Sequence, residues 1–384
     1  MKIGVFHSIY KPQTRGGAEV TVETMVNGLK SRGHEVFVVS AGYENKAETI
    51  DGIMVYRLKH FNLFNFFDLD KHPVWQRFFW HIIDMFNDGQ TWAAFKILQQ
   101  EKPELVITNS LKGLGYEIPW LLRIMKIRQI HVVHDMQLLH PSGLLPEKEV
   151  FSLPEKAYYV LCRLLFGSPA VVVFPSEYIK GIYGRFKFFK KSDCRVIGNP
   201  LPADTKFAIR KKALGAAIVF AYVGQVEEYK GIIDLIKAAS GISGEWKLLV
   251  AGDGSALPEA TRWSIDNKKI EILGRLTPAE LEHKIWSKAD IMINPSRVPE
   301  SFGLNVIEAY ARGIPVVAAK IGALQTVVKD GQTGWLFKAK DSSDLKRLLE
   351  FILNNRDKIA PLKPAALAEA KKYGIANYLA ELLK

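Results

Sequence analysis

Cysteine is nearly absent from this chain of 384 residues, which contains only Cys162 and Cys194. Two cysteines exclude a disulfide framework and a cysteine-based metal cluster, and such low usage is typical of the reducing cytoplasm. No apolar run approaches the roughly eighteen residues that a membrane span needs. The apolar run at the N-terminus is short and ends at Lys11, so we expect no signal peptide. These absences predict a cytoplasmic protein.

Repeats and low-complexity segments are also missing. The hydrophobic fraction of 48% and the charged fraction of 24% are typical of soluble globular proteins. A chain of 384 residues is long enough for about two domains, each with a core of its own.

Acidic residues are too few to balance the basic ones: 52 Lys and Arg stand against 40 Asp and Glu, a net charge of +12. Residues 1–198 hold 25 basic and 19 acidic residues, and the remainder holds 27 and 21, so each half carries an excess of six. A charge spread in this way predicts attraction to anions such as phosphorylated substrates or an anionic membrane. The sequence contains no nucleic-acid-binding motif, so we expect no nucleic-acid partner.

The stretch from Asp290 to Phe337 has the clearest local pattern. An apolar run, Ile291 to Asn294, predicts a strand, and Ser301 is expected to open a helix that reaches Arg312-Gly313. Ile314 to Ala318 predicts the next strand. This alternation indicates a parallel α/β sheet, in which ligands bind at the carboxyl ends of the strands.

Two carboxylates lie in this stretch, Glu300 in the loop and Glu308 about two helical turns later. The amides at the helix start would bind a phosphate, and the carboxylates would accept hydrogen bonds from sugar and ribose hydroxyls. This combination predicts a nucleotide-sugar site, although spacing alone also fits two solvated surface charges. The amides in question belong to Ser301, Phe302, Gly303 and Leu304.

The full string PS-x-x-x-E-S-F-G-L-x-x-x-E-A-x-A-x-G-x-P-V-V-A resembles the retaining glycosyltransferases of family 4. The resemblance implies the GT-B fold, in which two Rossmann-like α/β domains with parallel sheets face an interdomain cleft. It covers most of the chain and is strongest from 217 to 337. The expected division is an acceptor-binding domain at 1–198, a domain for the nucleotide sugar at 199–365, and a terminal helix at 366–384 that crosses back to the first domain.

In the first domain the resemblance assigns Gly16 and Gly17 to the loop that faces the donor phosphates and the acceptor. These glycines follow a predicted strand, but the G-x-G-x-x-G spacing of a dinucleotide site is absent. Another predicted strand of this domain, Gln129 to Val133, ends at His134-Asp135. His134 matches the family's active-site histidine, and His131 is expected in the core. Asp135 could orient His134 or bind elsewhere.

In the second domain Lys230 matches the family's phosphate-binding lysine, and Gln225 stands where the family has an arginine. The loss of that positive charge predicts one of three consequences: weaker catalysis, replacement of the charge by another cation such as Arg15 or Arg297, or an altered donor. Further donor-binding positions implied by the resemblance are Gly224, Gly252, Gly274, Arg275 and Leu276.

Residues 57–99 are crowded with aromatic and cationic side chains. The segment predicts either amphipathic helices with rings in the core, or a surface that rests on an anionic membrane or grips a lipid-linked acceptor. A basic and aromatic stretch, 179–196, is a second candidate for contact with an anionic surface, although a solvated helix face and loop is the commoner explanation for such a charge run. Asp68 and Asp70 have the spacing of a metal-binding pair, but we expect them to be structural.

The resemblance implies a metal-independent hexosyltransferase that needs no cofactor. It would move a sugar from a UDP- or GDP-linked donor to a glycan or lipid-linked acceptor, with His134, Lys230 and Glu300 as catalytic residues and Glu308 on the ribose. The expected setting is synthesis of cell-surface polysaccharide or glycolipid on the inner face of the membrane. A nucleotide-sugar epimerase, a phosphorylase-like enzyme and a binding subunit with a decayed site remain open alternatives.

Overall fold

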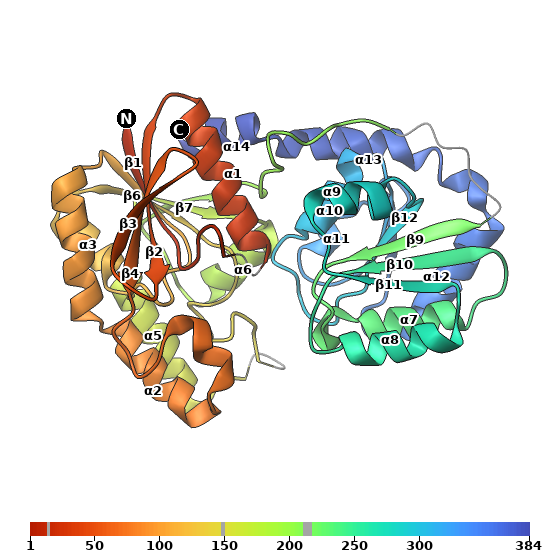
Figure 1. Cartoon of the computed structure of the whole chain (residues 1–384), viewed down its shortest axis with the longest axis horizontal. Coiled ribbons are helices and arrows are strands. Elements are labelled where there is room, and N and C mark those ends of the chain that lie inside the picture. Colours follow the sequence, from red (N-terminus) through yellow and green to blue (C-terminus); the bar gives the residue numbers. More distant parts are fainter. Residues whose placement is uncertain (14–15, 147–149, 210–216) are drawn as a thin grey trace. The chain divides into compact units, whose positions relative to one another are not determined.

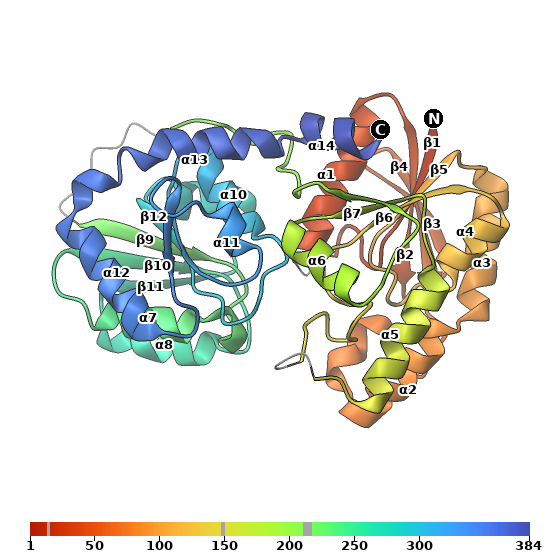
Figure 2. The ribbon, with the colours of Figure 1, turned by 180° about the vertical axis from the view of Figure 1, so that it is seen from behind.

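The computed structural model describes residues 1–13, 16–146, 150–209 and 217–384, apart from the side chains of residues 70 and 266 (Figure 1). The chain divides into two compact units, each a sheet with helices on both faces (Figures 1 and 2). The first unit comprises Met1–Pro200 together with Tyr378–Lys384, and the second comprises Leu201–Asn377.

The first unit is built on an eight-stranded sheet with the order β3-β4-β2-β1-β5-β6-β7-β8. All neighbouring strands are parallel except β3 and β4, which form a hairpin at the edge. Asp51 and Gly52 make its turn, both with positive φ, as an Asp-Gly hairpin turn requires. The strands are β1 (Lys2–Phe6), β2 (Glu35–Gly42), β3 (Lys46–Ile50), β4 (Ile53–Lys59), β5 (Leu105–Thr108), β6 (Arg128–Val132), β7 (Val171–Phe174) and β8 (Asp193–Val196).

Central strands of this sheet are buried on both faces, which explains their continuous apolar runs. His131 on β6 lies in this core, where its Nδ1 is 3.0 Å from the Thr108 hydroxyl, so the prediction that it is buried is confirmed. The helices are α1 (Gly17–Ser31), η1 (Phe66–Lys71), α2 (Val74–Met85), α3 (Asp88–Glu101), α4 (Ile118–Ile124), α5 (Leu153–Phe166), α6 (Glu177–Arg185) and, from the chain's end, part of α14 (Ile375–Leu382).

The second unit has a six-stranded sheet, entirely parallel, with the order β11-β10-β9-β12-β13-β14. The chain builds outward from β9 in one direction through β10 and β11, then returns beside β9 and builds in the other direction. The strand order therefore reverses between β9 and β12, and ligands of open α/β sheets bind at such a point. The strands are β9 (Ile218–Val223), β10 (Trp246–Ala251), β11 (Ile270–Gly274), β12 (Ile291–Asn294), β13 (Val316–Ala319) and β14 (Gly334–Phe337).

Separate apolar clusters cover the two faces of this sheet, one with α7, α8 and α12 and the other with α10 and α13. No described helix is both long enough and apolar enough to cross a bilayer. The helices are η3 (Glu228–Lys230), α7 (Ile232–Ser240), α8 (Leu257–Asp266), α9 (Pro278–Leu281), η4 (Glu282–Trp286), α10 (Leu304–Ala311), α11 (Leu324–Val327), α12 (Ser342–Asn354), η5 (Arg356–Lys358), α13 (Leu362–Ala370) and η6 (Lys371–Tyr373).

One predicted boundary is wrong: α10 begins at Leu304, three residues after Ser301. Gly303 is the N-cap and has a φ of 96°. This left-handed conformation does not fit inside a right-handed helix, so the helix starts only after it. Ser301 and Phe302 therefore belong to the loop between β12 and α10.

The burial of α7 gives a stability prediction. Ile236 on α7 is fully buried, whereas Ile265 on the neighbouring α8 is 73% exposed. We expect Ile236→Ala to lower the free energy of unfolding of the second unit by about 2–5 kcal/mol, because it removes buried methyl groups and leaves a cavity. The control Ile265→Ala should change it by about 0.5 kcal/mol or less. Urea unfolding measures both, and equal losses would contradict this packing.

Candidate functional site

The carboxyl ends of β9 and β12 bring Lys230 and Glu300 together. The Lys230 ammonium lies 2.7 Å from Glu300 Oε1, and the side chains are 24% and 16% exposed. Lys230 follows β9 and Glu300 follows β12, so the ion pair spans the point where the strand order reverses. Two residues seventy positions apart in sequence thus form one charged site.

Backbone contacts lock these two loops together. The Arg297 N–H donates to the Tyr229 carbonyl at 2.9 Å. Gly231 lies against the Pro295 carbonyl, where a Cβ would be only 1.9 Å from the oxygen. On the other side of Glu300, Gly322 fits against its backbone, and a Cβ there would lie 2.7 Å from the Glu300 nitrogen. Sequence reasoning did not assign Gly231 or Gly322 to the site, although Gly231 directly follows the matched lysine.

Three predicted donor-binding glycines lie side by side at the ends of β9, β10 and β11. The Gly224 N–H donates to the Ala251 carbonyl at 3.1 Å, and the Gly252 N–H donates to the Gly274 carbonyl at 2.8 Å. A Cβ on Gly252 would lie 1.7 Å from the Gly224 oxygen, so the strand ends approach this closely only without side chains. Arg275 follows directly on this edge, and Leu276 packs partly against the core.

Gln225 is held by two tyrosines, Tyr222 on β9 and Tyr229 on η3. The Tyr229 hydroxyl donates to Gln225 Oε1 at 3.0 Å, and the Tyr222 hydroxyl donates to the Gln225 carbonyl at 2.5 Å. Because Oε1 accepts this hydrogen bond, the side-chain amide nitrogen of Gln225 is the hydrogen-bond donor of the group. Of the two cations proposed to replace the family arginine, Arg297 pairs with Glu228 and Asp234, at 3.2 and 3.6 Å. The other, Arg15, lies outside the described residues.

The start of α10 is tied to the same sheet edge by Asn305, which sequence reasoning missed. Its Nδ2 donates to the Val223 carbonyl at 2.8 Å, and its Oδ1 accepts from Asn294 Nδ2 at 3.1 Å. The first amides of α10, at Leu304 and Asn305, lie beside the ends of β9 and β12, while the Val306 N–H donates to the Gly303 carbonyl at 3.0 Å. The Phe302 side chain is buried and packs on Tyr373, so only its backbone faces this site.

Glu308 lies on the second turn of α10 and is half-buried. Burial raises the pKa of Glu308 to about 7, although the nearby Arg312 acts in the opposite direction. The Arg312 guanidinium donates to the Glu308 carbonyl at 2.7 Å and pairs with Glu282 at 2.8 Å. Glu308 therefore titrates near neutral pH and does not behave as a solvated surface charge.

A second cluster lies in the first unit, at the carboxyl ends of β1, β5 and β6. Gly16 is the N-cap of α1, Gly17 is its first residue, and the Gly16 N–H donates to Glu19 Oε2 at 2.6 Å. Glu19 Oε1 lies 3.9 Å from Nε2 of the buried His7. Burial alone would raise the pKa of Glu19, but the contacts with His7 and Gly16 outweigh burial and hold it below its usual value. His7 and Glu19 were not predicted as site residues.

His134 belongs to the same cluster, and Asn109 orients it. Asn109 Nδ2 donates to the Phe6 carbonyl at 3.2 Å, so its Oδ1 faces His134 Nε2 at 2.9 Å and accepts from it. Asp135 instead accepts from the Gln137 N–H at 2.8 Å, so its candidate role as the orienting residue is wrong.

His134 is a neutral hydrogen-bonding group at pH 7. Burial, together with a smaller effect of His7, whose ring lies edge-on at 5.8 Å between ring centres, lowers the pKa of His134 to about 3. Because Nε2 carries the proton toward Asn109, Nδ1 presents a lone pair. That Nδ1 is buried and has no hydrogen-bond partner among the described residues.

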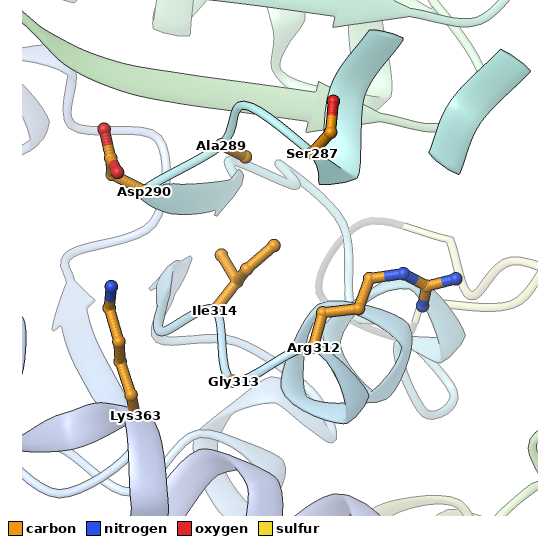
Figure 3. A pocket seen from close by; sticks show the side chains of 7 residues that line it. All are labelled: Ser287, Ala289, Asp290, Arg312, Gly313, Ile314 and Lys363. Atoms are coloured by element: carbon orange, nitrogen blue, oxygen red, sulfur yellow. The ribbon is translucent and has the colours of Figure 1, made fainter. Parts of the chain in front are cut away.

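A small pocket lies at the opposite edge of the second sheet, where residues lead into β12 and β13 (Figure 3). Its cavity volume is about 10 Å³, roughly the room for one water molecule. It is therefore too small for a nucleotide. Among the described residues there is also no group of three His, Cys, Asp or Glu side chains placed to hold a metal ion. The lining residues are Ser287, Ala289, Asp290, Arg312, Gly313, Ile314 and Lys363.

Comparisons with known proteins give matches over both halves of the chain. The family model "Glycosyltransferase Family 4" matches residues 15–205, and "Glycosyl transferases group 1" matches residues 204–372. D-inositol 3-phosphate glycosyltransferase of Corynebacterium efficiens is 31% identical over 304 residues, which cover 73% of this chain and 70% of that protein. An uncharacterized glycosyltransferase of Methanocaldococcus jannaschii is 25% identical over 93% of each chain.

Solved structures show the same fold. Sucrose-phosphate synthase of Thermosynechococcus elongatus has a TM-score of 0.79 at 18% identity, covering 100% of this chain and 98% of that one. HepE of Anabaena in complex with UDP has a TM-score of 0.73 at 18% identity, covering 100% and 99%. HepE has also been solved with UDP-glucose.

The raised pKa of Glu308 predicts a pH-dependent stability. Its folded pKa of about 7 lies above the ordinary 4.5, so the folded chain binds the proton more tightly than the unfolded chain. The resulting stabilisation is complete below the ordinary pKa and is lost as the pH rises through about 7. From pH 5 to pH 8 we expect the wild type to lose on the order of 1–2 kcal/mol of unfolding free energy relative to Glu308→Gln.

Urea unfolding at the two pH values measures this difference. Glu271→Gln, at an exposed position of the same unit, is the control and should leave the pH dependence of the wild type unchanged. A constant difference between wild type and Glu308→Gln at pH 5 and pH 8 would contradict the assignment.

Proposed function

The chain belongs to glycosyltransferase family 4 and is a glycosyltransferase of the GT-B fold, and we propose that it is a retaining, metal-independent hexosyltransferase. The donor is a UDP- or GDP-linked sugar and the acceptor is a hydroxyl group. The observation that carries the proposal is the ion pair between Lys230 and Glu300, at the point of the second sheet where ligands of α/β proteins bind.

Lys230 neutralises the departing pyrophosphate in this proposal. An ammonium has three N–H donors, and Glu300 accepts one of them at 2.7 Å, so donors remain for phosphate oxygens. The amides at the start of α10 and the amide nitrogen of Gln225 add neutral donors on the same edge. Charge that develops on the leaving phosphate is then stabilised by groups already in position.

The two carboxylates act on hydroxyl groups. Glu300, held beside Lys230, accepts hydrogen bonds from the sugar hydroxyls, and Glu308 accepts from the ribose. In the first unit the unpaired Nδ1 of His134 is an acceptor for another hydroxyl of the donor sugar. A neutral imidazole suits this role because it accepts a hydrogen bond without adding charge.

The proposed reaction retains the configuration at the anomeric carbon. The acceptor oxygen forms its bond to that carbon on the face from which the phosphate departs, while the bond between carbon and phosphate oxygen breaks. The acceptor's proton passes to the departing phosphate, which therefore serves as the base. Glu300 is engaged by Lys230, which favours hydroxyl binding over nucleophilic attack for this carboxylate.

The HepE complexes with UDP and UDP-glucose support a UDP-linked donor for this chain as well. We expect the acceptor to be a glycan or a lipid-linked glycan, used in cell-surface polysaccharide or glycolipid synthesis at the inner face of the membrane. The aromatic side chains of residues 57–99 support the lipid-linked form of the acceptor.

A ligand screen tests the donor. UDP, GDP and ADP are compared at one common concentration, because a nucleotide at about a hundred times its dissociation constant stabilises the folded state by about 2.7 kcal/mol and a non-binding nucleotide does not stabilise it. We expect UDP or GDP to raise the melting temperature and ADP to have little effect. A stabilisation by none of the three, measured by differential scanning fluorimetry, would contradict a nucleotide-sugar site.

Substitutions in the ion pair test catalysis. We expect Lys230→Ala and Glu300→Ala each to lower kcat for nucleotide release in the presence of acceptor by about 10²–10³-fold, because each removes charge stabilisation or sugar positioning. Lys329→Ala is the matched control, since Lys329 pairs with Glu369 at the same 2.7 Å in the same unit.

Unchanged turnover in both site variants would overturn the assigned site. Omitting the acceptor from the same assay separates transfer from other chemistry. A nucleotide-sugar epimerase would convert the donor without releasing nucleotide.

A further inference from the structure

Helix α2 presents a stripe of apolar side chains that the fold leaves uncovered. The side chains come in pairs four residues apart, which places them along one side of the helix. The opposite side is anchored, because Trp80 is fully buried and its Nε1 donates to the Phe64 carbonyl at 2.9 Å. The stripe consists of Val74, Trp75, Phe78, Phe79, Ile82 and Ile83, which are 72%, 64%, 47%, 52%, 43% and 37% exposed.

Helix α5 lies alongside α2 (Figures 1 and 2). The His81 ring on α2 contacts the Tyr158 ring on α5, with 6.4 Å between ring centres. Two leucines of α5 are among the most exposed apolar side chains of the unit: Leu153 is 82% exposed and Leu164 is 66% exposed. Uncovered apolar surface therefore extends over two adjoining helices.

A basic turn, residues 185–191, packs against α5. Its Phe186 ring lies 5.2 Å from Phe151 and 5.4 Å from Tyr159, and its Phe186 carbonyl accepts from Arg163 at 3.1 Å. No acidic residue occurs between Glu177 and Asp193. The turn thus adds positive charge beside the apolar helices. This charge is carried by the exposed side chains of Arg185, Lys187, Lys190 and Lys191.

We propose that α2, α5 and the basic turn form a docking face for an anionic lipid bilayer. The α2 stripe enters the boundary between headgroups and acyl chains, and the lysines lie over lipid phosphates. This inference rests on the proposed transfer to a lipid-linked acceptor, which would lie in the same bilayer.

The chemistry of the face favours lipid over a protein partner. Tryptophan, phenylalanine and isoleucine along one side of a helix, with cations beside them, are the composition of helices that lie in the membrane interface. The stripe itself contains no charged side chain, and its single side-chain hydrogen-bond donor is the indole N–H of Trp75, a residue type that suits the headgroup level of a membrane. With 12 residues, α2 is about 18 Å long, too short to cross the roughly 30 Å hydrocarbon core, so it lies in the plane of the interface.

Vesicle sedimentation tests the docking face. The full chain is mixed with vesicles of phosphatidylcholine containing about one third phosphatidylglycerol, and separately with pure phosphatidylcholine. We expect binding to the anionic vesicles that weakens as salt is added. Trp75→Ser/Ile82→Ser should bind at least about tenfold more weakly, because it removes two side chains from the stripe.

Two further variants separate the contributions. Trp92→Ser/Ile265→Ser is the matched control: these residues are 58% and 73% exposed but lie on α3 and α8, so vesicle binding should not change. Lys187→Gln/Lys190→Gln/Lys191→Gln should weaken binding to anionic vesicles by about fivefold for each lysine and remove most of its salt dependence.

Three results would overturn the inference. They are a wild type that binds neither vesicle, equal losses in the two double variants, and a Trp75→Ser/Ile82→Ser variant that changes from dimer to monomer while vesicle binding stays the same. The last result would assign the stripe to a second copy of the chain.

The rise in melting temperature induced by UDP or GDP, measured on the same variants, keeps this inference separate from the proposed function. An intact rise with no vesicle binding overturns only the docking face. A missing rise with intact vesicle binding overturns the proposed donor site and supports the docking face.

Discussion

The contact on which the second unit's site depends is the meeting of the loops that follow β9 and β12. These strands are neighbours only because the strand order reverses between them. Gly231 allows the loops to touch, through its close approach to Pro295, and the backbone bond between Arg297 and Tyr229 fixes their relative position. The ion pair between Lys230 and Glu300 is a consequence of this contact, since their side chains extend from backbone already held together.

The electrostatics of the two units differ in a way that suits a phosphate leaving group. In the second unit an ammonium, helix amides and a neutral glutamine gather at one sheet edge. In the first unit burial lowers the pKa of His134 to about 3 and keeps the ring neutral. Because Asn109 Oδ1 holds the ring proton at Nε2, the lone pair of the His134 ring is at Nδ1. The candidate site of the second unit thus carries positive charge, and the cluster of the first unit presents a neutral hydrogen-bonding ring.

Sequence reasoning identified much of this site because its signals are local. Apolar runs predicted the central strands, since a strand buried on both faces must be apolar throughout. Gly224 and Gly252 directly follow such a strand, Gly274 ends one, and Lys230 and Glu300 lie in the loops that come next after β9 and β12. Residues that act through distant partners were missed: His7, Glu19, Asn109 and Asn305 carry no local pattern that separates them from ordinary buried polar side chains.

By itself the sequence determined the parallel α/β architecture, the family, and the candidate residues at the strand ends, because periodicity and glycine placement depend on near neighbours in the chain. Only the tertiary structure decided which strand ends meet, because strand order depends on contacts between distant residues. It also decided the raised pKa of Glu308, the choice of Asn109 over Asp135 as the partner of His134, and which rings of residues 57–99 are buried. Trp80 lies in the core while Trp75 faces outward, and only packing against the rest of the unit distinguishes them.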